Sequence, residues 1–140
     1  MPNKIINADS TMRESGFGNN VITITDDITI GKDDNGNSYL IATDAKTITL
    51  ADACPIGMRI RVGNEGADNA VLIAIVGSAT VGVGGWNNVL AGTRTLLTRA
   101  VGKELRNTKA TALKYDYVEL EKVSATEWNA ITYGIWTKEA

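Results

Sequence analysis

Apolar and polar residues alternate in short runs along most of this chain. The clearest run is Met58 to Asn64, in which Ile60 and Val62 are separated by Arg59 and Arg61. A period of two places alternate side chains on opposite faces of a β-strand. The pattern therefore predicts a strand with two aliphatic residues facing a core and two arginines facing outward.

The last part of the chain, Tyr115 to Lys138, predicts a closing β-hairpin. Val118 and Leu120 fall on one face of its first strand, and Glu119 and Glu121 fall on the other. Ser124 to Glu127 is a polar turn. The return strand is expected to present Trp128, Ile131, Tyr133 and Ile135 as its apolar side, with Trp136 on the opposite face.

Turn signals separate the earlier runs. Asn35-Gly36 is typical of a two-residue hairpin turn, because both central residues of a type I′ turn need a positive φ. It predicts that the strands at Ile28 to Ile30 and Tyr39 to Thr43 pair with each other. Calcium binding by the Asp and Asn residues of this turn is the alternative, but their spacing does not fit a calcium loop.

The middle of the chain is richer in glycine. Ala70 to Val76 is apolar throughout, which predicts a strand covered on both faces. Thr80 to Asn87 contains three glycines beside Trp86, and these favour a bulge or close strand packing over a phosphate loop. The region from Val89 to Leu113 predicts two short extended segments, near Thr93 to Ala100 and Glu104 to Ala112.

These elements together predict an all-β fold. We expect a small antiparallel β-sandwich or barrel of about 8–10 short strands, formed by one domain at residues 21–140. Residues 1–20 are polar and aperiodic, and are expected to form an extended arm that packs on another subunit or another protein. The alternative is that this arm lies along its own domain.

The composition limits the kinds of functional site that the chain can contain. The formal net charge is −2, the chain has no histidine and its single cysteine is Cys54. This excludes a broad positive field for nucleic acid or membranes, the commonest general base, and an internal disulfide. The N-terminus lacks the apolar core of a signal peptide and no run is long enough to span a bilayer, so synthesis in the cytoplasm is expected.

Two charged pairs are the remaining candidates for chemistry. Arg59 and Arg61 could bind an anion, but cross-strand pairing with Glu119 and Glu121 is the stronger interpretation. The two glutamates share a strand face, as a glycosidase pair could, although solvated strands show the same pattern. We therefore predict no enzymatic activity, no metal and no cofactor.

The order of motifs from about residue 28 to 137 resembles small all-β domains of bacteriophage virion proteins, namely head fibres, capsid decoration proteins and tail-fibre segments. The shared features include Thr47-Ile-Thr-Leu50, the Pro55-Ile-Gly57 turn, Met58-Arg-Ile-Arg-Val62, Asp116-Tyr-Val-Glu-Leu120 and Gly134-Ile-Trp136. The resemblance implies a non-enzymatic structural protein of the virion, assembled as a homotrimer.

The leading hypothesis is a capsid decoration or head-fibre protein that attaches to the major capsid or another virion protein through its N-terminal arm. The alternative is a tail-fibre-type adhesin domain that binds a host surface glycan or protein. In that case exposed aromatic residues could stack on a sugar, with Tyr39, Tyr133, Trp86 and Trp136 as candidates. Subunit or particle contacts are predicted at Ile5, Ile6, Met12, Val71, Ile73, Ile75, Trp86 and Trp136.

Overall fold

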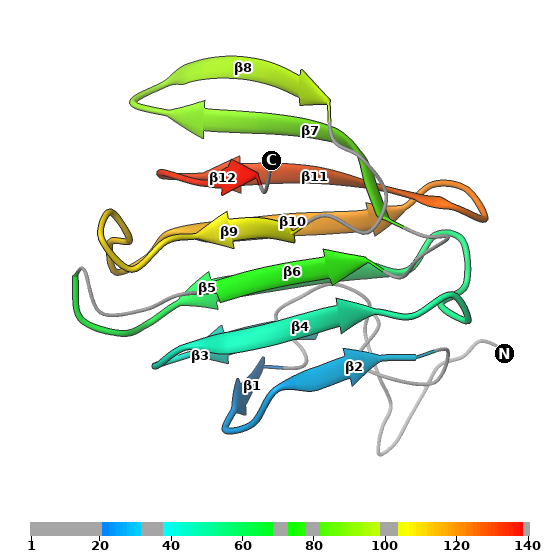
Figure 1. Cartoon of the computed structure of the whole chain (residues 1–140), viewed down its shortest axis with the longest axis horizontal. Helices are drawn as coiled ribbons and strands as arrows, with labels where there is room; N and C mark the ends of the chain where they lie inside the picture. Colours follow the sequence, from blue (N-terminus) through cyan, green and yellow to red (C-terminus); the bar gives the residue numbers. More distant parts are fainter. Residues whose placement is uncertain (1–20, 32–37, 69–72, 78–81, 99–103, 139–140) are drawn as a thin grey trace, which may run out of the picture.

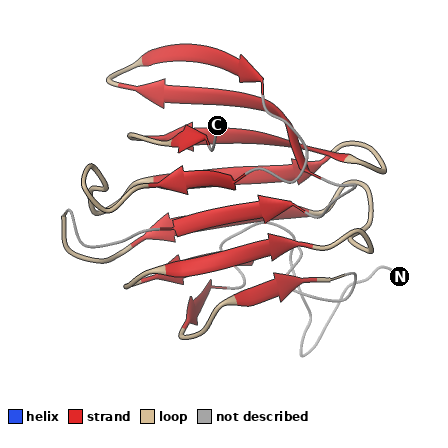
Figure 2. Cartoon of the chain, in the orientation of Figure 1, coloured by secondary structure: helices blue, strands red, loops and turns tan. Residues whose placement is uncertain are grey.

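The chain folds into two β-sheets that lie one in front of the other (Figure 1). This computed structural model describes residues 21–31, 38–68, 73–77, 82–98 and 104–138. Every regular element in these ranges is a strand (Figure 2), which confirms the all-β prediction. The larger sheet has the order β1-β3-β5-β10-β11-β7-β8, and the smaller sheet has the order β12-β9-β6-β4-β2.

The first six strands alternate between the two sheets. They are β1 (Val21–Ile24), β2 (Ile28–Ile30), β3 (Ser38–Ala42), β4 (Lys46–Leu50), β5 (Arg59–Asn64) and β6 (Ile73–Gly77). β1, β3 and β5 pair in parallel in the larger sheet, and β2, β4 and β6 pair in parallel in the smaller one. The chain therefore winds as a short coil in which each turn adds one strand to each sheet.

This winding corrects two expectations. The sheets are mixed, whereas antiparallel pairing was predicted throughout. The strands on either side of Asn35-Gly36 do not form a hairpin, because β2 and β3 belong to different sheets; the turn itself lies outside the described residues. A period of two shows which face of a strand is buried, but it carries no information about the strand's partner.

The second half of the chain closes both sheets. It contributes β7 (Gly82–Leu90), β8 (Thr93–Thr98), β9 (Glu104–Asn107), β10 (Tyr117–Lys122), β11 (Glu127–Tyr133) and β12 (Thr137–Lys138). β10 and β11 form the predicted hairpin, and β8 and β9 occupy the two extended segments expected between Val89 and Leu113. β7 and β8 are joined at Ala91-Gly92, where both residues have positive φ, as a type I′ turn requires.

The core lies between the sheets and is one continuous apolar cluster. Its largest members are Trp86 and Trp128, with aliphatic side chains from strands of both sheets. In β11 the inward side chains are Trp128, Ala130 and Thr132. Ile131 is therefore outward and 38% exposed, which corrects its predicted place beside Trp128 on the apolar side. Trp136 is buried, after β11 has ended.

A buried polar network joins the two sheets at one end. Asn64 at the end of β5 donates to Asn107 of β9, and Asn107 donates to the Asp116 carboxylate and to the Ile135 carbonyl. Asp116 also accepts from the amide of Leu113. The network satisfies polar groups that would otherwise be costly to bury, so it fixes how the ends of the sheets meet.

Candidate ligand-binding face

The outward side of the larger sheet carries polar and aromatic side chains that are not part of the core. On three adjacent strands, β10, β11 and β7, the register aligns these side chains in rows. Glu119 lies beside Ile131, which lies beside Asn87, and the neighbouring row contains Glu121, Asn129 and Gly85. We call this surface the outer face. Its residues come from segments that are far apart in the sequence.

Four planar side chains stack in a line across the outer face, from β3 to β11. The Arg61 guanidinium lies 4.8 Å from the ring centre of Tyr39 and 3.9 Å from that of Tyr117. Tyr117 in turn stacks on Tyr133, with 4.3 Å between ring centres and 22° between planes. Arg61 Nε has no hydrogen-bond partner among the described residues, so the cation–π contacts are its principal support there. We call these four residues the aromatic stack.

The sequence makes room for this stack at Gly63. A Cβ at this position would lie 2.8 Å from Tyr39 Cε1 and 2.9 Å from Cζ, closer than the ring allows. Glycine therefore lets the Tyr39 ring lie over the neighbouring strand. Burial raises the pKa of Tyr39 above its ordinary value, with a smaller opposing effect from Arg61. Burial also raises the pKa of Tyr117, and Tyr133 adds to that rise.

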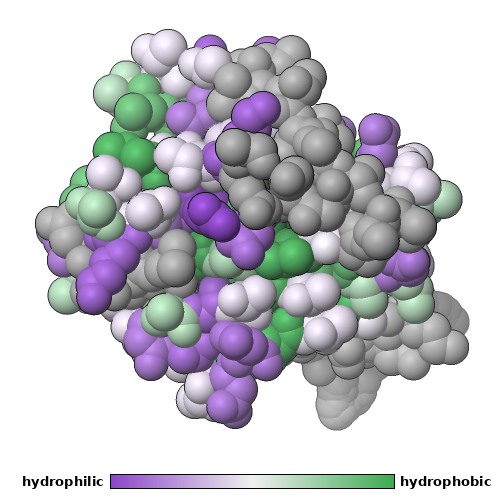
Figure 3. Space-filling model, viewed as in Figure 1, coloured by the Kyte–Doolittle hydropathy of each residue, from purple (hydrophilic) through white to green (hydrophobic). Residues whose placement is uncertain are grey.

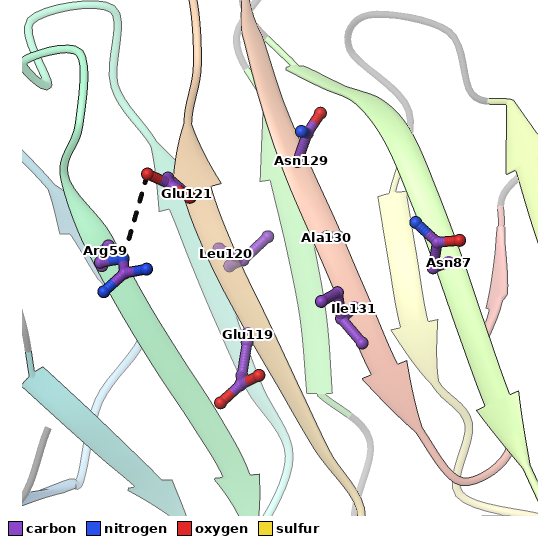
Figure 4. Close-up of a pocket in the computed structure, with 8 residues that line it drawn as sticks. All are labelled: Arg59, Asn87, Glu119, Leu120, Glu121, Asn129, Ala130 and Ile131. Carbon is purple, nitrogen blue, oxygen red and sulfur yellow. Dashed lines mark ion pairs between the residues drawn. The ribbon is translucent and has the colours of Figure 1, made fainter. Parts of the chain in front are cut away.

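A shallow groove lies beside the stack, with a volume of about 260 Å³. Figure 4 shows Ile131 near its centre, with Glu119 and Glu121 of β10 on one side, Asn87 of β7 on the other, and Asn129 farther along β11 itself. Pockets that enclose drug-sized ligands are larger, ~300–1,000 Å³. The groove therefore suits one unit of a larger ligand that lies along the surface.

The charges of the groove are arranged in opposed pairs. Arg59 Nε lies 3.9 Å from Glu121 Oε2, and Arg61 is the register partner of Glu119. The structure thus confirms the cross-strand interpretation for Arg59 and Glu121. Because both members of that pair are about half exposed, the ion pair adds little stability, but it orients both side chains over the groove.

None of the predicted contact residues that the structure describes lies on the outer face. Ile5, Ile6, Met12 and Val71 fall outside the described residues. Ile73, Ile75, Trp86 and Trp136 are buried in the core, at most 4% exposed. Their own chain already covers these four side chains, so they offer no surface to a second subunit and neither tryptophan is placed to stack on a sugar.

Tyr39 and Tyr133, which the adhesin alternative named as exposed aromatic residues, are half-buried on the outer face. The sequence interpretation missed Tyr117, Asn87 and Asn129. Tyr117 could have been found, because it continues the alternation of Glu119 and Glu121 on the same strand face. The two asparagines could not, because their proximity depends on the parallel pairing of β7 with β11.

The described residues contain no cluster of three or more His, Cys, Asp or Glu side chains that could hold a metal ion. They also contain no helix with the length and hydropathy that crossing a membrane requires. Figure 3, viewed from the side of the smaller sheet, shows hydrophilic and hydrophobic residues interspersed, without one continuous apolar surface among the coloured atoms.

Comparison with known proteins gives no functional information, so inferences about function rest on the outer face. No protein-family model matches the chain, and neither the curated proteins nor the solved structures contain a significant match.

Proposed function

We propose that this protein is a non-enzymatic component of a bacteriophage particle that binds a ligand on the host surface through the outer face. The observation that carries the proposal is the aromatic stack beside a polar groove. Partly exposed tyrosines next to charged and amide groups supply both apolar contact and hydrogen bonds, the combination that binding surfaces use. The phage context comes from the sequence resemblance alone.

A binding role fits the groove better than hydrolysis does. Glu119 and Glu121 both face the groove, but each lies opposite an arginine of β5. The groove is also smaller than the pockets of ~300–1,000 Å³ that enclose a small ligand. The two carboxylates are therefore placed to accept hydrogen bonds from a ligand that lies along the surface.

The test is binding of the purified full chain to a panel of bacterial envelopes, compared with Tyr133→Ala. A matched control is Tyr115→Asn, because Tyr115 is also an exposed tyrosine, makes none of the contacts of the aromatic stack, and has a positive φ that asparagine tolerates. We expect the wild type and the control to bind at least one envelope, and Tyr133→Ala to bind it at least about tenfold more weakly. Equal binding by Tyr133→Ala, or no binding by the wild type, would refute the proposal.

Attachment through residues 1–20, and assembly as a homotrimer that decorates the capsid, stay predictions from the sequence. Deleting residues 1–20 tests the first, since the truncated protein should fold and no longer attach to particles. Light scattering tests the second. Neither outcome alters the argument for the outer face.

A further inference from the structure

We infer that the ligand of the outer face is a neutral, hydroxyl-rich saccharide that lies along β11, with one sugar unit over Ile131 and the next against Tyr133. This inference rests on the proposed binding function and adds the chemical class of the ligand. It draws on the charge balance of the groove, on its arrangement of polar and apolar groups, and on the position of Tyr133.

Charge balance argues against an ionic ligand. The groove is lined by two glutamates, Glu119 and Glu121, and each faces one arginine across the β5–β10 pair. These four groups sum to zero net charge, so they provide no field that would concentrate a polyanion or a polycation. A strand of nucleic acid or an acidic polysaccharide would bring its charge against two carboxylates, and a basic peptide would meet two guanidinium groups.

The polar groups are placed to bind hydroxyls. Ile131 forms an apolar centre that is 38% exposed, with Glu119 on one side and Asn87 on the other in the same row. A pyranose ring has this same division, with C–H groups on its face and hydroxyls around its edge. Carboxylates accept strong hydrogen bonds from hydroxyls, and the NH₂ group of an amide donates them.

The next row along the strand contains Tyr133, the terminal member of the aromatic stack. One face of its ring contacts Tyr117. Ile131 and Tyr133 are two residues apart on one strand, so their Cα atoms lie roughly 6.6–6.8 Å apart. A chain of sugars laid along β11 would therefore reach Tyr133 directly after it leaves Ile131.

Gly85 makes room for Asn129 at the other end of the groove. A Cβ on Gly85 would lie 2.8 Å from Asn129 Oδ1, so the glycine leaves room for the Asn129 side chain to lie across the strand. Asn129 is exposed and lines the groove in Figure 4. The chain thus places a third hydrogen-bonding side chain in line with Ile131 and Tyr133 on the outward side of β11.

The experiment is a glycan array that contains neutral and acidic saccharides, with oligolysine as a basic probe, read with the labelled full chain at low and high salt. The variants are Glu119→Gln and Tyr133→Ala. Their controls are Glu104→Gln, which disturbs a glutamate–arginine pair in the smaller sheet, and Tyr115→Asn. We expect binding to a neutral saccharide with little salt dependence, a loss of roughly tenfold or more for each variant, and no loss for the controls.

The outcomes separate this inference from the function on which it rests. Binding to acidic glycans or oligolysine alone, weakened by Tyr133→Ala, would overturn the neutral-saccharide class and preserve the binding face. Binding to envelopes without binding to any neutral saccharide would also overturn it. A failure to bind any envelope would instead refute the proposed function, as described above.

Discussion

Lys122 gives the sharpest test of how the structure supports the loop before β5. Its side chain is almost entirely buried, at 2% exposure for the residue, and its ammonium donates to two backbone carbonyls. The distances are 2.9 Å to the oxygen of Asp52 and 2.7 Å to that of Cys54. The backbone of Lys122 also bonds to Gly57 and Met58, so this one residue anchors both ends of the turn.

Replacing Lys122 with methionine keeps the length of the side chain and removes both charged donors. A hydrogen bond from a charged donor contributes ~1.5–3 kcal/mol, and a buried acceptor that loses its donor costs ~1–3 kcal/mol. Two effects reduce the sum: the ammonium no longer has to be desolvated, and the exposed Asp52 segment can bind water. We expect Lys122→Met to lower the free energy of unfolding by about 2–3 kcal/mol.

Urea denaturation measures this change. With a slope of ~1–3 kcal/mol per molar, typical of small proteins, the loss should move the midpoint down by roughly 1 M. Lys109→Met is the control, because Lys109 is exposed in the loop after β9, and its midpoint should stay within about 0.2 M of the wild type. A midpoint for Lys122→Met as close to the wild type as that of the control would refute the assigned role of the ammonium.

Two further predictions concern a glycine and a tyrosine. Gly134 has φ +103°, and a Cβ there would collide with the Asp116 carboxylate, so Gly134→Ala should cost at least about 3 kcal/mol in urea denaturation. Gly92→Ala, at φ +81° with open space around it, should cost only about 1 kcal/mol, and equal losses would contradict the collision. Because burial raises the native pKa of Tyr117 above 10.0, its stabilising contribution is complete below that pH and is lost as the pH rises through the native pKa. Stability measured across this alkaline range should therefore fall less steeply in Tyr117→Phe, and an unchanged slope would contradict the raised pKa.

The sequence determined which side chains of many strands face inward. Ile60 and Val62, and likewise Val118 and Leu120, are buried, while the charged residues between them face outward. It also indicated the closing hairpin, because a short polar turn joins two strands that are consecutive in the sequence and can pair with each other directly. The glycines before Trp86 indicated a bulge, and the β7–β11 register shifts opposite Trp128 and Asn129. Local sterics and solvent preference fix these features, and both are encoded within a few residues.

Only the tertiary structure decided which strands are neighbours. Parallel pairing joins β7 to β11 and β3 to β5 across long stretches of chain, and no local signal specifies such partners. The structure also decided which side of β11 Ile131 occupies. Ile131 is three residues after Trp128 and therefore lies on the opposite side, and a shift of one position would have exchanged the two sides of the strand. The aromatic stack and the groove follow from the order of the strands. Arg61, Tyr117 and Asn87 lie on one surface because three separate segments of the chain align in the larger sheet.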